Sequence, residues 1–265
     1  MIEFGDYNKD ISYVKTASEF NNDALMWVYS YKIDNVMFDA GCPNAKHEFK
    51  EYLKHVDIDK LVISHFHEDH SGGASLFVDK AIIYARPETR EIIRDPPQLS
   101  EFFQWAWGQP EPVENVEVVP EVIEIGDMTF ETIELFGHSP EMIGLYEKER
   151  GWLFSADAVP SQTRKNAAMP EENVPRIIET MEKILRLKPK VLFDGHRGPI
   201  ENPSEHISKR VGFLKELQKK IQDMHVNGLS ISEIKDQLDL EPPWYMDLTE
   251  GRFSFDHLIK SLLED

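Results

Sequence analysis

Residues 60–73, KLVISHFHEDHSGG, are the stretch that decides the fold and the chemistry of this chain. Its first five residues are mostly apolar and predict a buried strand, which ends directly before His65. His65 and His67 are two positions apart, so an extended segment points both imidazoles to the same side. Asp69 and His70 follow where the chain is expected to turn into a helix. Because imidazole nitrogens and carboxylate oxygens bind zinc, iron or manganese, the pattern predicts a corner with four potential metal ligands.

Further histidines and aspartates stand at the ends of predicted strands along the chain. They are Asp39 in VMFDAG, His138 in LFGHSP, Asp157 in LFSADAV and His196 in FDGHRGPI. A sandwich of two packed sheets can gather strand ends along one rim, where residues distant in sequence meet. Taken singly, His138 and His196 would more often be turn or core histidines and Asp157 a turn residue, so their assignment depends on their order and context.

The hexapeptide HFHEDH resembles the HxHxDH signature of the metallo-β-lactamase superfamily, and the four other motifs follow in that family's order. The resemblance implies two divalent metal ions. Zinc is the favoured metal, and iron or manganese are the alternatives. The implied ligands are His65, His67 and His138 for one metal, Asp69, His70 and His196 for the other, and Asp157 between them. Asp39 is implied to orient a ligand histidine by accepting its other N–H.

The resemblance and the order of elements together predict an α+β fold, the αββα four-layer metallo-β-lactamase sandwich. The catalytic domain is expected over residues 1–203, and a helical tail, similar to the winged-helix-like tails of some superfamily hydrolases, over residues 204–265. The expected strands are 11–17, 25–31, 36–39, 60–64, 81–85, 116–119, 122–125, 128–135, 142–147, 152–155 and 190–193. The expected helices are 45–55, 71–79, 87–94, 170–187, 205–225, 231–238 and 253–263. Ser230 and Glu233 predict a capping box at residue 231.

Composition and charge narrow the classes of partner. A net charge of −19 repels a polyanion, so nucleic acid is disfavoured and a small-molecule substrate is expected. The single cysteine, Cys42, cannot form an internal disulfide, which is typical of a reducing cytoplasm. No apolar run approaches the roughly 18–20 residues of a membrane span, and MIEFGDYNKD lacks the features of a secretory signal. We therefore expect a cytoplasmic protein without a membrane partner, whose tail serves packing or a homodimer.

The implied activity is hydrolysis. Two cations can bridge one water and lower its pKa toward neutrality, so that the metal-bound hydroxide attacks a carbonyl carbon or phosphorus. Asp69 would ligate a metal and could also take the proton from the nucleophile, which makes it the candidate catalytic residue. The whole ligand set is most similar to the glyoxalase II branch, which cleaves thioesters, and to its lactonase neighbours. Residues 158–166, AVPSQTRKN, depart from the Cys-Gly-Arg element of glyoxalase II, which argues against a glutathione thioester.

Residues 95–112 are predicted to be an insertion rich in proline and aromatic side chains. Phe103, Trp105 and Trp107 could form an apolar wall of the substrate pocket, with an interface patch or packing against a helix as the alternative. Arg197, beside His196, could pair with a substrate carboxylate, with a surface salt bridge as the alternative. The insertion and Arg197 are therefore candidates for substrate contact.

Two other activities on the same fold stay open. A phosphodiesterase similar to ribonuclease Z would share the HxHxDH site, but the net charge of −19 and the lack of a recognisable tRNA-gripping arm argue against it. An iron-dependent oxidoreductase similar to flavodiiron proteins is the other alternative, although no flavodoxin-like domain follows and HFHEDH has the hydrolase-type histidine at its third position. A binuclear hydrolase of small thioesters, lactones or other esters is the favoured hypothesis.

Overall fold

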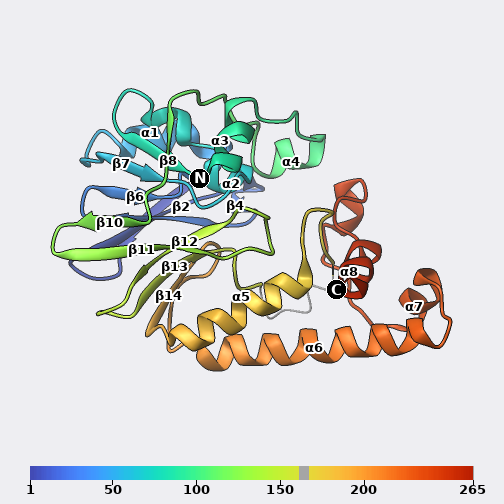
Figure 1. Ribbon diagram of the computed structural model, residues 1–265. Helices are drawn as coiled ribbons and strands as arrows, with labels where there is room; N and C mark the ends of the chain where they lie inside the picture. The colour runs from blue at the N-terminus through green and yellow to red at the C-terminus, as the bar shows by residue number, and fades with distance from the viewer. Residues whose placement is uncertain (161–166, 265) are drawn as a thin grey trace. The chain divides into compact units, whose positions relative to one another are not determined.

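The computed structural model describes residues 1–160 and 167–264. They divide into two compact units, whose elements are labelled in Figure 1. The first unit comprises Met1–Glu134, Ile143–Ala156 and Val191–Glu201, and the second comprises Leu135–Met142, Asp157–Lys190 and Asn202–Asp265. The predicted domain boundary at residue 203 lies close to the start of the last of these segments and stays a prediction.

Within the described ranges, one sheet of the first unit has seven strands. In spatial order they are β1 (Ile2–Asp6), β2 (Ile11–Thr16), β5 (Val28–Ile33), β6 (Val36–Phe38), β7 (Lys60–Val62), β8 (Ile82–Ala85) and β9 (Val116–Val118). The strands β1 to β6 of this sheet pair antiparallel, whereas β6 to β9 pair parallel. Parallel neighbours need longer crossovers, which here contain α1 (Lys46–Tyr52), α2 (Glu68–Ser71) and α3 (Pro87–Arg94). A separate hairpin, β3 (Glu19–Phe20) and β4 (Asp23–Ala24), follows β2 in the chain.

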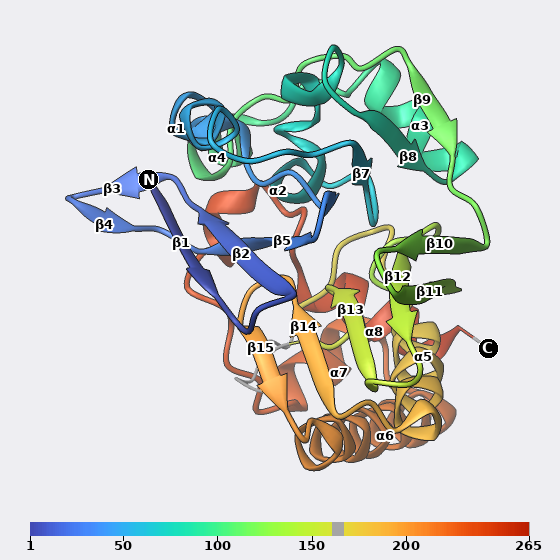
Figure 2. The ribbon, with the colours of Figure 1, turned by 90° about the vertical axis from the view of Figure 1, so that its left-hand side faces the viewer.

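The second sheet of the first unit is formed by the later strands. In spatial order they are β10 (Val122–Ile125), β11 (Met128–Glu134), β12 (Ile143–Glu147), β13 (Trp152–Ala156), β14 (Val191–Asp194) and β15 (Gly198–Glu201). Neighbours pair antiparallel except β13 and β14, which run in the same direction and are seen side by side in Figure 2. Ala156 and Asp194 are register partners at the ends of that parallel pair. Both strands therefore end at the same edge of the sheet.

Aromatic rings fill the space between the two sheets. The ring of Tyr31 on β5 lies 5.4 Å from that of Phe154 on β13 and 5.3 Å from that of Phe193 on β14. Phe154 and Phe193 stack at 4.3 Å, and Phe38 of β6 lies 5.9 Å from Phe154. Buried aromatic pairs stabilise a core by about 0.5–1.5 kcal/mol each beyond the area they remove from water. These rings join the two sheets into a sandwich.

The other face of the seven-stranded sheet packs against helices of the first unit. Side chains alternate between the faces of a strand, so Met37 points away from its neighbour Phe38. Met37 and Leu61 belong to a buried cluster that includes Phe49 of α1 and Phe77. The rings of Phe49 and Phe77 lie 6.0 Å apart. The sheet is thus buried on both faces, as the apolar composition of its central strands requires.

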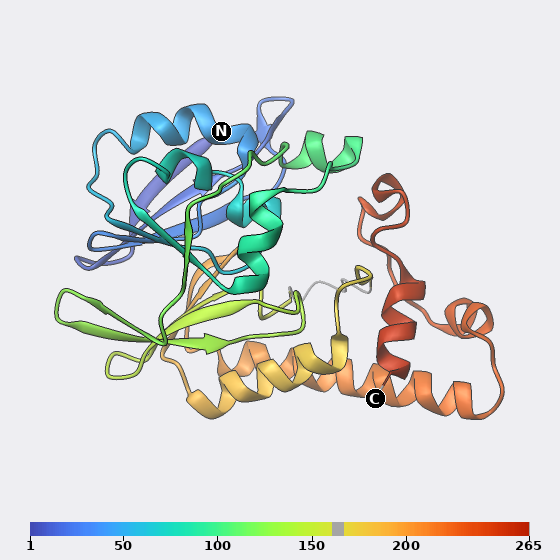
Figure 3. The ribbon, with the colours of Figure 1, turned by 45° about the horizontal axis from the view of Figure 1, so that its top comes forward.

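The second unit contains helices α5 (Val174–Leu187), α6 (Ser204–Val226), α7 (Ile231–Gln237) and α8 (Phe255–Leu263). Figures 1 and 3 show α5 and α6 running side by side. Asn173, Ser230 and Ser254 cap α5, α7 and α8 by accepting a backbone N–H. The predicted capping box of Ser230 and Glu233 is confirmed. Among the described residues, no helix combines the length and apolar character needed to cross a membrane.

Several element boundaries differ from the sequence-based expectation. The helix predicted over 71–79 is replaced by α2, which ends at Ser71, and by a 3₁₀ helix at Ala74–Phe77. The glycines between them approach neighbouring backbone closely: a Cβ on Gly73 would lie 2.2 Å from the carbonyl oxygen of Ala40. The helix predicted from residue 170 begins only at Val174. The strands β1 and β15 were not predicted, since both contain glycine and β15 also contains proline, residues that are depleted in strands.

Candidate metal centre

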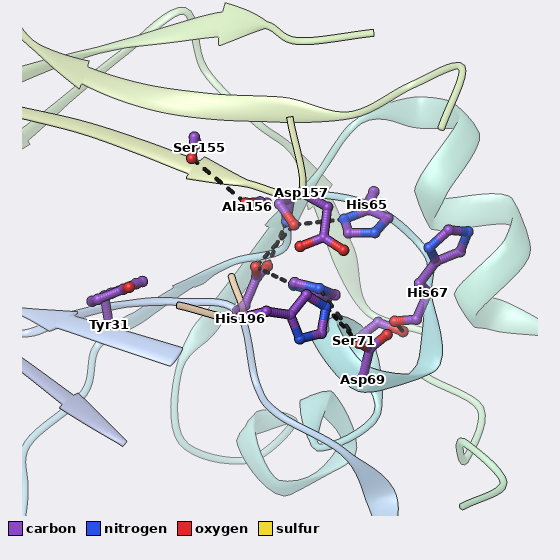
Figure 4. Close-up of polar contacts among 12 residues, drawn as sticks. Tyr31, His65, His67, Asp69, Ser71, Ser155, Ala156, Asp157 and His196 are labelled. Carbon is purple, nitrogen blue, oxygen red and sulfur yellow. Dashed lines mark hydrogen bonds and ion pairs between the residues drawn. The ribbon is translucent and has the colours of Figure 1, made fainter. Parts of the chain in front are cut away.

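The histidine-rich corner forms directly after strand β7, as the sequence predicts. His65 and His67 are buried, and their rings lie 4.6 Å apart. His67 is extended, with φ −56° and ψ 144°, and the next residue begins helix α2. That helix carries Asp69 and His70, so the ring of His70 lies 4.4 Å from that of His65. Figure 4 shows His65, His67 and Asp69 projecting from this one turn of chain.

Asp69, His70 and His196 form a cluster suited to one cation. Their ligand atoms all lie within 4.8 Å of one another. The Oδ2 atom of Asp69 is 3.7 Å from Nε2 of His70 and 3.4 Å from Nε2 of His196. His196 follows β14, at the edge of the second sheet, whereas the other two come from the corner after β7. Residues separated by more than a hundred positions are thus brought together within the first unit.

Asp39 holds two neighbours of this cluster in place. Its Oδ2 accepts from Nδ1 of His70 at 2.8 Å, and its Oδ1 accepts from the backbone N–H of Ser64 at 2.8 Å. The Ser64 hydroxyl donates to Oδ2 of Asp39 at 2.9 Å and lies 2.9 Å from Nδ1 of His65. Burial raises the pKa of Asp39, and the imidazole of His70 partly opposes that shift. Asp39 has the position in this structure that the resemblance implies, because it leaves Nε2 of His70 to face the cluster.

His196 is fixed by the turn that follows β14. Its Nδ1 lies 2.8 Å from the carbonyl oxygen of Trp27, so Nδ1 donates there. Asp194 accepts the backbone N–H groups of His196 and Arg197, both at 2.9 Å. The guanidinium of Arg197 also pairs with the buried carboxylate of Asp194. Neither Asp194 nor Trp27 was singled out from sequence, although an aspartate two residues before a ligand is a plausible turn residue.

Two further predicted ligands, His138 and Asp157, lie in the second unit. His138 is in the loop Leu135–Met142, and Asp157 comes directly after Ala156 at the end of β13. Nε2 of His138 lies 3.5 Å from Oδ2 of Asp157, so their ligand atoms face each other. Nδ1 of His138 lies 2.8 Å from Oε1 of Glu172. Sequence reasoning did not identify Glu172, because it lies 34 residues from His138.

The residues fit divalent cations. The donor set consists of imidazoles and carboxylates, the groups that zinc and related metals bind. In His65, His70, His138 and His196, Nδ1 contacts a serine hydroxyl, a carboxylate or a carbonyl oxygen of the same unit. Metal-binding histidines typically show this arrangement, since the contact at one nitrogen fixes the tautomer and directs the other nitrogen to the metal.

The aromatic insertion contributes one ring close to these ligands. It contains helix α4 (Glu101–Ala106), and the ring of Trp107 lies 6.1 Å from that of His196. Trp107 and Phe103 are buried, whereas Trp105 is 39 % exposed and contacts Phe20 of the hairpin at 5.5 Å. The side-chain amide of Asn44 donates to the carbonyl oxygens of Gln104 and Trp105, both at 3.1 Å. These bonds attach α4 to the loop after Asp39.

Residues 158–166, where the sequence departs from glyoxalase II, are described only in part. Residues 161–166 lie outside the described residues. Ala158 and Val159 are buried, and the comparison of this segment with the glyoxalase II element stays at the level of sequence.

Comparison with known proteins agrees with the fold and the ligand pattern. A family model described as the metallo-beta-lactamase superfamily matches residues 24–196. A beta-lactamase-like protein 2 homolog from Caenorhabditis elegans is 24% identical over 226 residues, which cover 80% of this chain and 70% of that protein. A beta-lactamase domain protein from Burkholderia ambifaria superposes with a TM-score of 0.72 at 13% identity, over 98% of this chain and 86% of that one. A metallo-beta-lactamase from Pontibacter korlensis superposes with a TM-score of 0.64 at 14% identity, over 81% of this chain and 99% of that one.

The solved structures establish the fold, and the predicted α+β sandwich is confirmed. The family model covers well over half of the chain and runs through the histidine-rich corner to His196. This chain therefore belongs to the metallo-beta-lactamase superfamily.

Proposed function

We propose that the protein is a binuclear metal-dependent hydrolase that cleaves a small thioester, lactone or other ester. The observation that carries the proposal is the pattern at Nδ1. Four predicted ligand histidines have this atom in contact with a protein oxygen, which directs Nε2 to a cation. Most members of the superfamily are hydrolases, which supports the reaction class. The proposed ligands are those that the sequence predicts: His65, His67, Asp69, His70, His138, Asp157 and His196.

Divalent cations in such a site, most simply zinc, would lower the pKa of a water toward neutrality and polarise the carbonyl oxygen of the substrate. Asp69 is proposed to accept the proton of that water. Its carboxylate faces Nε2 of both His70 and His196, so it lies among the ligands, and its side chain is only 9% exposed. A buried carboxylate in this position is shielded from bulk solvent and suited to a proton transfer.

The surroundings of His196 favour a substrate with an apolar part. Trp107 places a buried indole ring beside the imidazole. Elsewhere on the same insertion, the exposed ring of Trp105 packs against the exposed ring of Phe20. The guanidinium of Arg197 is paired with Asp194, which favours a structural role over a contact with a substrate carboxylate. The net charge of −19 disfavours a polyanionic substrate. An apolar thioester, lactone or aryl ester fits this combination better than an oligonucleotide.

The proposal is tested by measuring metal content and hydrolysis on the same samples. The full chain is loaded with zinc, manganese or iron, freed of unbound metal, and assayed with thioesters, lactones, aryl esters and phosphodiesters. We expect two bound ions per chain and the highest kcat/KM on an apolar ester or thioester. Purified protein that binds no cation under any loading condition would refute the proposal. Preferred cleavage of phosphodiesters would establish the alternative activity, and oxygen consumption with iron would establish an oxidoreductase.

The role of Asp69 is tested by Asp69→Asn, with Asp57→Asn as the matched control because Asp57 is exposed and lies in the same unit. Loss of a positioned proton acceptor typically lowers kcat by about 10²–10⁴-fold. We expect a loss of this size in Asp69→Asn and none in the control. Full turnover by Asp69→Asn with both metals retained would remove the proton-accepting role and leave the rest of the proposal intact.

A further inference from the structure

We propose that Glu172, supported by the C-terminal helix α8, is the positioning residue that fixes His138 for metal binding. This inference rests on the proposed function, since it assigns a role toward the metal that His138 is proposed to hold. Every contact that carries it lies within the second unit. The C-terminal segment, expected from sequence to serve only packing or dimer formation, would thus contribute to the metal centre.

The first step is the choice of ring nitrogen in His138. Oε1 of Glu172 lies 2.8 Å from Nδ1, and Oδ2 of Asp157 lies 3.5 Å from Nε2. An ionised carboxylate can only accept a hydrogen bond, so a neutral imidazole in contact with Glu172 carries its proton on Nδ1. The lone pair is then on Nε2, the atom that faces Asp157. Glu172 thereby selects the tautomer that can ligate a cation at Nε2.

The second step is that both oxygens of Glu172 are used. While Oε1 contacts His138, Oε2 accepts the backbone N–H of Met169 at 2.9 Å. The Glu172 side chain is only 10% exposed, so water competes little for either oxygen. A glutamine has an oxygen at only one of these two positions, so it cannot reproduce both contacts. If its carbonyl turned to Met169, its NH₂ group would face Nδ1 and favour the tautomer with the proton on Nε2.

The third step is that the same stretch of chain also holds the backbone around His138. The N–H of Asn173 donates to the carbonyl oxygen of Gly137 at 2.8 Å. The hydroxyl of Thr180 on α5 donates to the carbonyl oxygen of Phe136 at 2.7 Å. Gly137 has φ +132°, and a Cβ there would lie 2.5 Å from the backbone nitrogen of Ile177. The loop therefore lies against the start of α5 too closely to shift independently of Glu172.

The last step connects this stretch to helix α8. The buried hydroxyl of Ser261 donates to the carbonyl oxygen of Glu172 at 3.1 Å and accepts the N–H of Val174 at 2.8 Å. Ala168 and Ser254 exchange two backbone hydrogen bonds, both 3.1 Å long. The segment just before α8 and its last turn thus hold the chain on both sides of Glu172, from residues more than eighty positions away.

The experiment compares Glu172→Gln with Glu179→Gln in the full chain. Glu179 is the matched control because it is exposed on α5 and pairs with Arg176. Affinities for the two zinc ions are measured by competition with a chromophoric chelator, and the variant His138→Ala identifies the ion that depends on His138. Loss of a group that orients a ligand typically weakens metal binding by about 10–100-fold. We expect a loss of this size in Glu172→Gln, for the same ion as in His138→Ala, and no change in Glu179→Gln.

Ser261→Ala tests the contribution of α8 with the same measurement. It removes two neutral hydrogen bonds but no ligand and no carboxylate, so we expect the affinity for that ion to fall about two- to tenfold. Folding of each variant is checked by circular dichroism. Should Glu172→Gln fail to fold, the result for Ser261→Ala tests the inference. Wild-type affinity for both ions in these variants would overturn the inference. A wild-type protein without bound zinc would instead refute the proposed function.

Discussion

The two units hold their candidate ligands in different ways. In the first unit, His65, His67, Asp69 and His70 come from six consecutive residues at one strand-to-helix corner. In the second unit, His138 and Asp157 stand alone in the sequence, and His138 is fixed by Glu172 and by the start of α5. Local backbone geometry therefore brings four candidate ligands of the first unit together, and Asp39 and the distant His196 complete that set. In the second unit, contacts between distant segments hold His138. The first set should depend on the corner itself, and the second on the packing of the helices.

The largest effect that tests this difference between the two units is expected at Asp39. Asp39→Ala removes the acceptor for His70 and for the backbone N–H of Ser64. We expect an about 10–100-fold loss of affinity for one zinc ion and a loss of about 1–3 kcal/mol in the free energy of unfolding, because a buried N–H is left without its acceptor. Chelator competition and urea denaturation measure the two effects.

The informative result is which ion is affected. Asp39 contacts His70 directly and His65 only through Ser64, so Asp39→Ala should weaken mainly the ion that is spared in Glu172→Gln. Loss of the same ion in both variants would contradict the distinction between the units. Asp39→Asn is the matched variant, because asparagine tolerates the φ of +64° at this position as aspartate does.

Gly137→Ala should separate the backbone support of His138 from its side-chain support. The residue has φ +132° and no room for a Cβ beside Ile177. We expect the free energy of unfolding to fall by more than about 1 kcal/mol, together with weaker binding of the ion that depends on His138. Gly212→Ala is the control, because a Cβ at Gly212 in helix α6 meets nothing within 4 Å. It should be neutral or stabilising by up to about 1 kcal/mol.

Ser230→Ala should have a smaller and purely structural effect. It removes the capping box of α7, in which Ser230 and Glu233 exchange hydrogen bonds. The expected loss is about 1 kcal/mol in the free energy of unfolding, with unchanged affinity for both zinc ions. A change in metal affinity would contradict this expectation and would show that helix α7, in addition to α8, supports His138.

The smallest effect is expected for the reaction of the Cys42 thiol with a disulfide reagent. This reaction measures how often the loop after Asp39 opens and needs no substitution. Burial raises the pKa of the Cys42 thiol to about 11, partly opposed by the hydrogen bond with Thr16. At pH 8 only about one thiol in a thousand is then ionised, so we expect very slow reaction with a disulfide reagent. Urea should make the reaction fast. Rapid reaction in the native protein would mean that the loop after Asp39 opens readily.

The sequence could predict the fold and the histidine-rich corner of the first unit, but not the contacts that hold His138 in the second unit. The apolar run before His65 and the two-residue spacing of His65 and His67 reflect local chain geometry, which a sequence carries directly. The capping box of α7 was predicted for the same reason. Glu172 and Ser261 were missed, because each acts through a partner dozens of residues away. The interruption of the helix predicted over residues 71–79 was also missed. It occurs at Gly72 and Gly73 and depends on a tertiary contact with the backbone of Ala40.

The attachment of helix α4 has a consequence for how this fold can vary. The side chain of Asn44 bonds to Ser18 and to two carbonyl groups of α4. The candidate ligands of the first unit instead follow strands β7 and β14, and His70 among them contacts Asp39. The aromatic insertion could therefore differ in length or composition without disturbing the contacts that hold the candidate ligands of the first unit.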